Sequence, residues 1–266
     1  MPDHDNWDRH WDLYGGAASR NPAQQMRHEI VVRLLGEPSA GEAAHGPTAR
    51  VLDVGSGQGD LLAKLHHELP EAELLGFEMS RSGVEQSRVK VPAAHFLVVD
   101  LFQPPADAES YAGWATGAVC SEVLEHVDDP AAFLKAARRY LADGGRLVIT
   151  VPGGPMSAFD RQIGHRTHFT RESIRRVAEE AGFSVERVCL SGFPFFNLYR
   201  LVVIARGERL GSDVASGQHG FSARLAQAVM AVFRGLFRFN LMDFPLGWQV
   251  VAVARKPVGT ARAPSP

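Results

Sequence analysis

Short apolar segments alternate with helical segments through the middle of this chain, and this alternation constrains the fold more than any other feature. Apolar, β-branched runs of this length indicate buried strands. They are predicted at 50–54, 74–78, 95–99, 118–122, 146–151, 184–190 and 248–254. Helices are predicted at 60–69, 80–89 and 170–181, and a further helix begins at Asp129-Pro130 and ends at Gly144-Gly145. The alternation predicts an α/β fold with a parallel sheet covered on both faces.

Composition and pattern divide the chain into five segments, 1–49, 50–190, 191–245, 246–257 and 258–266. The first is polar, with one helix predicted at 22–35, and the second holds the alternating core. The third is an apolar insertion that breaks the alternation and contains eight of the 15 phenylalanines. The fourth carries the last core strand, and the fifth is expected to be a disordered tail.

Composition and charge exclude several classes of protein. The chain has 266 residues, 28 basic and 30 acidic side chains and a formal net charge of −2, which does not support a nucleic acid as partner. The two cysteines, Cys120 and Cys189, exclude a disulfide scaffold and a four-cysteine zinc site. The most apolar stretch, 226–239, is interrupted by Arg234 and Arg238, so no transmembrane segment is expected. Because the N-terminus does not resemble a signal peptide, a cytoplasmic location is expected.

A glycine-rich loop follows the first predicted strand and leads into the first core helix. It carries glycine at positions 55, 57 and 59, which lets a ligand approach the backbone. Glu78, at the end of the second strand, is placed to bind a ribose diol, so the pattern favours a nucleotide-type cofactor. Dinucleotide binders prefer the spacing G-x-G-x-x-G, which this loop lacks. An acid inside the first strand, Asp53, is also unusual for them and could hold a ligand's ammonium group.

These residues resemble the first motif of the class I S-adenosylmethionine-dependent methyltransferases, and three later stretches resemble motifs of their ubiquinone-type subgroup. The stretches are Val99-Asp-Leu101, Ser121-Glu-Val-Leu-Glu-His-Val127 with Asp129-Pro130, and Gly144-Gly-Arg-Leu-Val-Ile-Thr-Val-Pro152. The resemblance covers about residues 48–190 and the last strand. It implies a Rossmann-like seven-stranded mostly parallel sheet with helices on both faces. Around this core we expect an N-terminal helical lid and a Phe-rich helical insertion before the last strand.

The resemblance implies S-adenosylmethionine as cofactor. The predicted cofactor-binding residues are Tyr14, Arg27, Asp53, Gly55, Ser56, Gly57, Glu78, Met79, Asp100, Leu101, Ser121 and Glu122. The loop glycines are expected under the methionine part of the donor, and Arg27 at its carboxylate. Glu78 is expected at the ribose, Met79 on the adenine face and Asp100 at the adenine amino group. The two residues after the fourth strand are expected beside the sulfonium.

A cluster of acids and histidines follows the fourth and fifth strands. Glu122, Glu125, His126 and His165 resemble the Glu-x-x-Glu-His motif and downstream histidine of metal-assisted methyltransferases. They are candidate ligands for a divalent metal such as Mg or Zn, which would lower the pKa of an acceptor hydroxyl. The candidate catalytic residues are His126, His165, His168 and Glu125. Without a metal, His165 or His168 remains the candidate general base, whereas His126 forms the pocket wall or starts a helix and Glu125 hydrogen-bonds the backbone.

The two edges of the chain leave alternatives open. The aromatic N-terminal segment either folds over the donor as a lid or packs on the sheet edge. The insertion caps an apolar or aromatic acceptor, forms a dimer face, or contacts a membrane surface or lipid-like acceptor. The chain is therefore expected to be a monomer or a homodimer, with peripheral membrane contact as one option.

The function expected from these features is methyl transfer from S-adenosylmethionine to a small or medium-sized apolar acceptor, preferably on oxygen. One alternative is an NAD(P)-dependent oxidoreductase, which the glycine spacing disfavours. A second alternative is a non-catalytic cofactor-binding scaffold protein whose insertion docks a partner.

Overall fold

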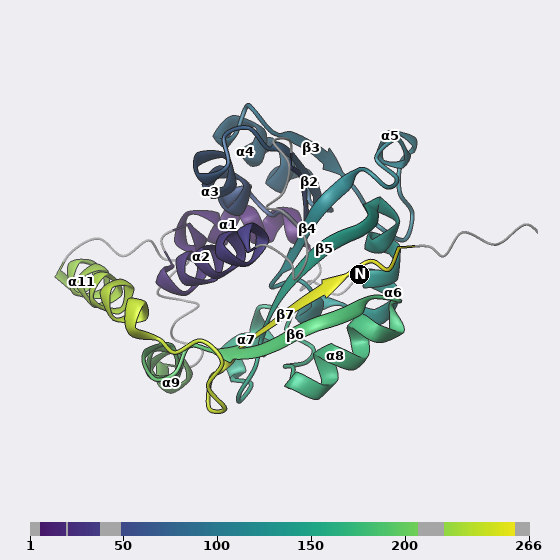
Figure 1. The fold of residues 1–266 in the computed structure, drawn as a ribbon. Helices are drawn as coiled ribbons and strands as arrows, with labels where there is room; N and C mark the ends of the chain where they lie inside the picture. The colour runs from purple at the N-terminus through teal and green to yellow at the C-terminus, as the bar shows by residue number, and fades with distance from the viewer. Residues whose placement is uncertain (1–5, 20, 38–48, 207–220, 259–266) are drawn as a thin grey trace, which may run out of the picture.

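A computed structural model describes residues 6–19, 21–37, 49–206 and 221–258, and its centre is a seven-stranded sheet (Figure 1). The strands are β1 (Arg50–Val54), β2 (Glu73–Glu78), β3 (His95–Val98), β4 (Ala115–Ser121), β5 (Leu141–Pro152), β6 (Ser184–Ser191) and β7 (Gln249–Arg255). Their order across the sheet is β3-β2-β1-β4-β5-β7-β6. The strand β7 is antiparallel to both of its neighbours, and the other pairs are parallel. The predicted mostly parallel sheet is confirmed.

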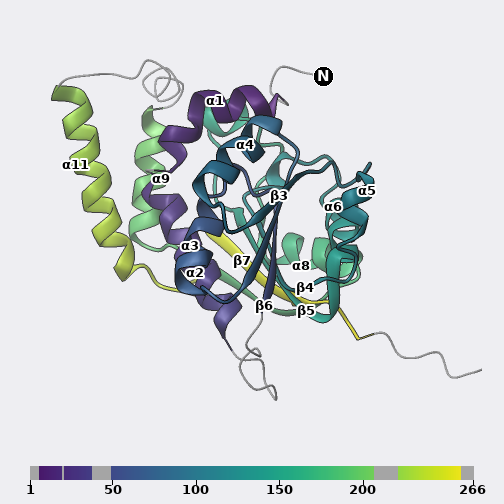
Figure 2. The same ribbon diagram turned by 90° about the horizontal axis from the view of Figure 1, so that it is seen from above.

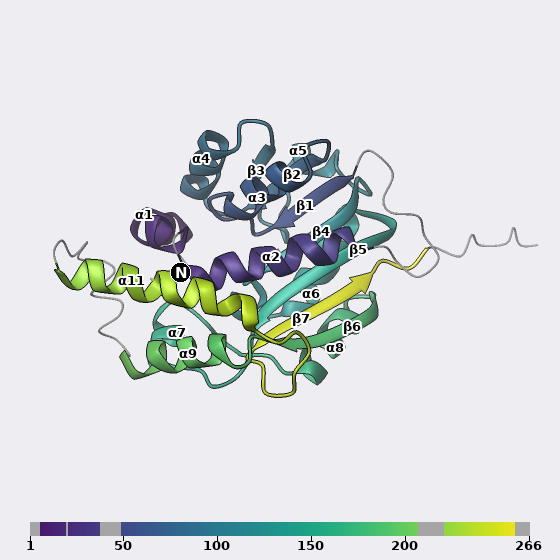
Figure 3. The same cartoon turned by 60° about the vertical axis from the view of Figure 1, so that its left-hand side comes forward.

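Helices cover both faces of the sheet (Figure 3). In the described residues the α-helices are α1 (Trp7–Ala18), α2 (Pro22–Gly36), α3 (Asp60–Glu68), α4 (Arg81–Lys90), α5 (Ala106–Glu109), α6 (Pro130–Ala137), α7 (Ala158–Gln162), α8 (Arg171–Glu180), α9 (Phe195–Arg206) and α11 (Phe221–Leu236). Short 3-10 turns are η2 (Leu124–His126), η3 (Arg138–Tyr140) and η4 (Phe237–Phe239). The predicted helices at 22–35, 60–69, 80–89 and 170–181 correspond to α2, α3, α4 and α8.

Successive residues of the central strands feed two hydrophobic cores, one on each face. In β1, Val51 packs into the core under α2, α3 and α4, and Leu52 packs into the core under α6 and α8. In β5, Val148 belongs to the first core and Ile149 to the second. Because both faces are buried, these strands are continuous apolar runs, which is why the sequence pattern locates them.

The prediction was wrong about one helix end. The helix expected to end at Gly144-Gly145 ends at Ala137, and after η3 the chain already enters β5. Gly144 has a φ of 78°, and its N–H donates to the carbonyl of Lys256 at 2.9 Å. The glycine therefore bends the start of a strand, a left-handed conformation that also ends many helices.

The N-terminal helix α1 and the insertion lie beside the carboxyl ends of the strands, whereas α2 covers one face of the sheet. Asp8 on α1 accepts hydrogen bonds from the Ser80 hydroxyl at 2.6 Å and the Ser82 N–H at 3.0 Å, which anchors α1 to the start of α4. The insertion contains the helices α9 and α11, which lie side by side at one edge of the molecule (Figure 2). The predicted disordered tail lies outside the described residues, apart from Val258. Among the helices of the described residues, none has the length and apolarity to cross a membrane.

Candidate functional site

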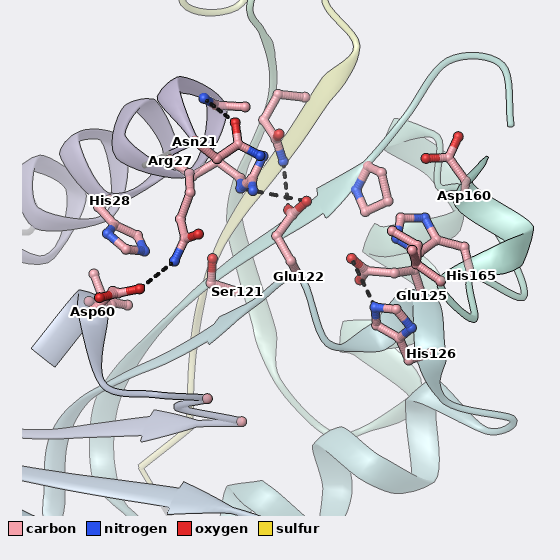
Figure 4. A pocket seen from close by; sticks show the side chains of 18 of the residues that line it. Asn21, Arg27, His28, Asp60, Ser121, Glu122, Glu125, His126, Asp160 and His165 are labelled. Carbon is pink, nitrogen blue, oxygen red and sulfur yellow. Dashed lines mark hydrogen bonds and ion pairs between the residues drawn. The ribbon is translucent and has the colours of Figure 1, made fainter. Parts of the chain in front are cut away.

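A pocket of about 360 Å³ opens at the carboxyl ends of the central strands, where a parallel sheet places its ligands. Its floor is the glycine loop and the turn after β4, and its walls come from α1, α2, α7, α9 and α11. Figure 4 shows the lining side chains that α2, the turn after β4 and α7 contribute. Its lining includes the predicted residues Arg27, Asp53, Gly55, Ser56, Gly57, Ser121, Glu122, Glu125, His126 and His165. The predicted residues Glu78, Met79, Asp100, Leu101 and His168 do not line it. Tyr14 lies on α1, and its side chain is outside the described part of the chain.

The lid candidate α1 packs directly on the glycine loop. Gly57 has a φ of 55°, and a Cβ atom at this position would lie 2.5 Å from the ring of Trp11. Gly83 at the start of α4 faces the same ring, because its Cβ would be 3.0 Å from Trp11. Trp11 therefore fills the space over the loop, and glycine is the residue that this close contact permits.

Two acids lie below this loop. Glu78 is buried, and its two carboxylate oxygens each accept a backbone N–H at 2.8 Å, from Gly57 and from Ser80. Asp53 lines the pocket and is 2% exposed. Burial, reinforced by the nearby Glu78, raises the pKa of Asp53 to about 7. The glutamate thus holds the loop in shape, and the aspartate is the acid that a ligand in the pocket can meet.

The residues predicted to bind adenine lie together beyond Glu78, at the ends of β2 and β3. Met79 is about half exposed, and Leu101 is buried. The Asp100 carboxylate accepts the N–H of Phe102 at 2.9 Å, which fixes a local turn. The N–H of Val99 donates to the carbonyl of Glu78 at 2.9 Å, so the two strand ends are adjacent. The structure thus groups the predicted adenine-side residues at one edge of the sheet.

Glu122, directly after β4, is held in an uncommon conformation. Its φ is 55°, a left-handed value that few residues other than glycine adopt. Its N–H donates to the carbonyl of Thr150 at 2.8 Å, and its carboxylate accepts from the Gln249 amide at 2.9 Å. The Arg27 Nε lies 3.6 Å from the other carboxylate oxygen (Figure 4). These contacts turn the Glu122 carboxylate toward Arg27. Glu122 therefore does not belong to the group of possible metal ligands around Glu125.

One carboxylate and two imidazoles do gather at the far side of the pocket. The potential ligand atoms of Glu125, His126 and His165 lie within 4.8 Å of one another. Glu125 is fully buried, and within the described chain neither of its carboxylate oxygens accepts a hydrogen bond. Burial, and then the nearby Glu122, raise its pKa well above the ordinary value. The N–H of Arg166 donates to the Glu125 carbonyl at 2.7 Å, which fixes the His165 loop against η2.

A hydrogen-bond chain determines which nitrogen of His165 carries the proton. His168 Nδ1 lies 3.1 Å from the carbonyl of Gly154, and a carbonyl only accepts, so this nitrogen carries the proton. Its Nε2 then accepts from His165 Nδ1 at 3.1 Å, which leaves Nε2 of His165 unprotonated. Burial lowers the pKa of His165 to about 3 and also lowers the pKa of His168, so both rings are neutral at pH 7.

The sequence interpretation missed an ion pair in the pocket wall. Arg200 on α9 donates two hydrogen bonds to the Asp160 carboxylate, at 3.0 and 2.8 Å. Burial alone would raise the pKa of Asp160, but Arg200 and the hydrogen bonds from Ser157 hold it well below its usual range. The only sequence signal is Ser-x-x-Asp, which predicts a capping box at α7 but not the distant arginine.

Aromatic and apolar side chains surround this end of the pocket. The lining includes Phe196, Tyr199 and Val203 from α9, together with Trp248 before β7. Trp7 of α1 contacts the His126 ring edge-on, with ring centroids 4.9 Å apart. The insertion therefore supplies an apolar wall opposite the polar cluster.

Comparison with known proteins relates this chain to methyltransferases. Residues 23–188 match the family model described as a methyltransferase domain. A ubiquinone biosynthesis O-methyltransferase of Acinetobacter baylyi is 27% identical over 161 residues, 59% of this chain and 62% of the relative. An uncharacterised 37.1 kDa protein in transposon Tn4556 of Streptomyces fradiae is 31% identical over 160 residues, 53% of this chain and 45% of that protein. The chain thus spans only about half of these relatives' length.

Solved structures share the fold at low sequence identity. A geranyl diphosphate C-methyltransferase of Streptomyces coelicolor, solved with Mg²⁺, geranyl diphosphate and S-adenosylhomocysteine, is 15% identical, with a TM-score of 0.54 over 88% of this chain and 79% of that chain. The [4+2]-cyclase SpnF is 20% identical, with a TM-score of 0.56 over 89% of this chain and 83% of that chain. At these identities the likeness establishes the Rossmann-like fold alone.

Proposed function

The chain belongs to the methyltransferase domain family of class I S-adenosylmethionine-dependent proteins, and we propose that it transfers a methyl group to a hydroxyl of a small or medium-sized apolar acceptor. The family match and the loop glycines support S-adenosylmethionine as the donor over a nicotinamide cofactor. The predicted cytoplasmic location remains part of this proposal, and two free, buried cysteines agree with it.

The observation that carries the oxygen acceptor is the buried Glu125 carboxylate beside His126 and the neutral imidazole of His165, opposite the apolar wall of the pocket. Within the described chain this carboxylate accepts no hydrogen bond. A hydroxyl group must lose its proton to become a good nucleophile. An apolar wall does not assist that loss, so a polar group beside the acceptor is needed. The name of the Acinetobacter relative, an O-methyltransferase, also supports oxygen as the accepting atom. Methyl transfer breaks the carbon–sulfur bond, leaves the electron pair on sulfur and forms a carbon–oxygen bond, while the hydroxyl proton passes to water.

We further propose that Glu125, His126 and His165 hold a divalent cation in the working protein. The donor set fits, because an imidazole ligates in its neutral form, which His165 has at pH 7, and within the described chain the buried Glu125 carboxylate accepts no hydrogen bond. His165 with a pKa of about 3 would be a weak general base at pH 7, which favours a cation over a free histidine. When bound, a cation would lower the pKa of the acceptor hydroxyl. His168 then acts as a positioning residue that fixes the tautomer of His165.

The test combines metal binding with methyl transfer. Equilibrium dialysis against Mn²⁺ or Zn²⁺ should detect one ion per chain, and Glu125→Gln should weaken its binding at least tenfold. The control variant Glu85→Gln changes an exposed acid on α4 and should bind like the wild type. Labelled S-adenosylmethionine, offered with hydroxylated, amino and purely hydrocarbon acceptors of similar size, should label the hydroxylated ones, and EDTA should abolish labelling.

Different outcomes would remove different parts of the proposal. No bound ion, together with turnover that EDTA does not change, would rule out the cation but leave methyl transfer standing. Labelling of an amine or a carbon acceptor in place of the hydroxyl would rule out oxygen. Binding of S-adenosylhomocysteine without turnover on any acceptor would favour the non-catalytic scaffold.

A further inference from the structure

The helix α9 exposes apolar side chains to solvent, while two of its polar side chains lie on its inner face beside Phe196 and Val203. Its polar side chains Asn197 and Arg200 point inward, where Asn197 accepts the N–H of Trp248 at 3.1 Å and Arg200 pairs with Asp160. Outward, Leu198, Leu201, Val202 and Ala205 form an exposed stripe at helical spacing. Leu198 and Leu201 are about half exposed. A helix on a water-facing surface normally turns charged and polar side chains outward.

The second helix of the insertion also exposes apolar residues. On α11 and η4, Ala228, Val232, Gly235 and Phe239 are exposed at positions i, i+4, i+7 and i+11, so they share one face. Val232 is 61% exposed and Phe239 70% exposed. In the described chain, eight of the 14 exposed large apolar side chains belong to residues 191–246. This concentration is too large to be the scattered apolar exposure of an ordinary surface.

The charges of the two helices all have one sign. Residues 195–206 and 221–239 contain five arginines and no aspartate, glutamate or lysine. Arg234 and Arg238 are exposed, lie four residues apart at the border of the α11 stripe, and within the described chain pair with no carboxylate. Apolar residues flanked by arginines are the pattern of helices that lie in the interface of an anionic bilayer.

We infer that the outer faces of α9 and α11 dock on a membrane surface that contains anionic lipids. The apolar stripes enter the boundary between headgroups and acyl chains, and Arg234 and Arg238 contact lipid phosphates. A second copy of this chain is a poorer occupant, because a twofold contact would face one acid-free basic surface with another. The inference concerns the outer faces and does not depend on the acceptor, on the cation or on methyl transfer.

The docked orientation would place the pocket at the membrane. The inner faces of the same two helices line it, through Phe196, Tyr199 and Val203 on α9 and Met230 on α11. Figure 2 shows the pair at the edge of the molecule, beyond the N-terminal helix α1. A ligand dissolved in the bilayer would therefore reach the pocket along these helices.

Vesicle co-sedimentation of the full chain tests the inference. Vesicles of equal parts phosphatidylglycerol and phosphatidylcholine should bind the protein, and pure phosphatidylcholine should bind it much more weakly. The double variant Arg234→Gln/Arg238→Gln should lower binding about 30-fold, since each arginine near an anionic surface contributes about 1 kcal/mol. Leu201→Gln/Val202→Gln should also weaken binding, and high salt should weaken it in the wild type.

Matched variants keep the test specific. Arg175→Gln/Arg176→Gln on α8 removes two exposed arginines elsewhere, and Val89→Gln removes an apolar side chain that is 83% exposed on α4. Both controls should bind vesicles like the wild type. No binding to anionic vesicles, or equal losses in the controls, would overturn the inference. A stable dimer in light scattering that Val232→Gln/Phe239→Gln converts to monomer would assign this face to a second copy instead.

Discussion

Asp53 combines deep burial with a position in the pocket lining, and its raised pKa of about 7 has a consequence for cofactor binding. An ammonium group on the cofactor would stabilise the ionised carboxylate, so binding must displace the proton that Asp53 carries below pH 7. The affinity for S-adenosylhomocysteine is therefore expected to rise about tenfold from pH 6 to pH 8. Calorimetric titration at both pH values measures this change.

A ligand without the ammonium and a variant without the acid provide the controls. 5′-Methylthioadenosine lacks the amino-acid part of the cofactor, so its affinity should be the same at both pH values. Asp53→Asn should bind S-adenosylhomocysteine more weakly and without the pH dependence. If Asp53→Asn kept the pH dependence of binding, the assignment of Asp53 as the titrating group would be contradicted.

The raised pKa of Asp53 has the opposite effect on folding. Because the folded protein holds this proton more tightly than the unfolded chain, the free energy of unfolding should fall as pH rises from 3.8 to about 7.

At the scale of elements, the pair Asp160–Arg200 joins α7 to α9 and so attaches the insertion to the core. Asp160 is 1% exposed and Arg200 13% exposed, so removing either partner leaves a buried charge unpaired. Asp160→Ala and Arg200→Met are each expected to lower the free energy of unfolding by about 3 kcal/mol. The double variant should lose clearly less than the sum.

Urea unfolding measures these free energies. The exposed pair Arg176–Glu180 on α8 offers a matched control, and Arg176→Met should change stability by less than about 1 kcal/mol. Because the pKa of Asp160 is depressed in the folded protein, its contribution is complete at neutral pH and is lost as pH falls below 3.8. Additive losses in the double variant would mean that the two side chains stabilise the protein independently.

Local sequence signals located most elements but not their long-range partners. The strands were predictable because burial on both faces makes them continuous apolar runs. The end of α6 was not predictable, because a glycine pair can end a helix and can also bend the start of a strand, as Gly144 does in β5. Asp160 and Arg200 were missed because they lie 40 residues apart and meet only through packing. The φ of Glu122, which turns its carboxylate toward Arg27, likewise depends on contacts with Thr150 and Gln249.

At the scale of the whole molecule, the parallel order of β1, β4 and β5 brings together residues that are distant in the chain. The glycine loop, the turn after β4 and the His165 loop meet at one edge of the sheet, and the insertion closes the pocket from the side. The motif residues could be placed at this edge from the sequence. The apolar wall was only one of three roles that the sequence left open for the insertion, because the family resemblance did not cover it.

The most direct test of the account is a calorimetric titration of the full chain with S-adenosylhomocysteine and, separately, with NADH. The account predicts one S-adenosylhomocysteine bound per chain and no binding of NADH. Asp53→Ala should weaken the binding by removing the acid in the pocket, and Glu78→Ala by releasing the loop that its carboxylate holds. A chain that binds NADH but not S-adenosylhomocysteine would contradict the central claim that this pocket is the site of a methyltransferase.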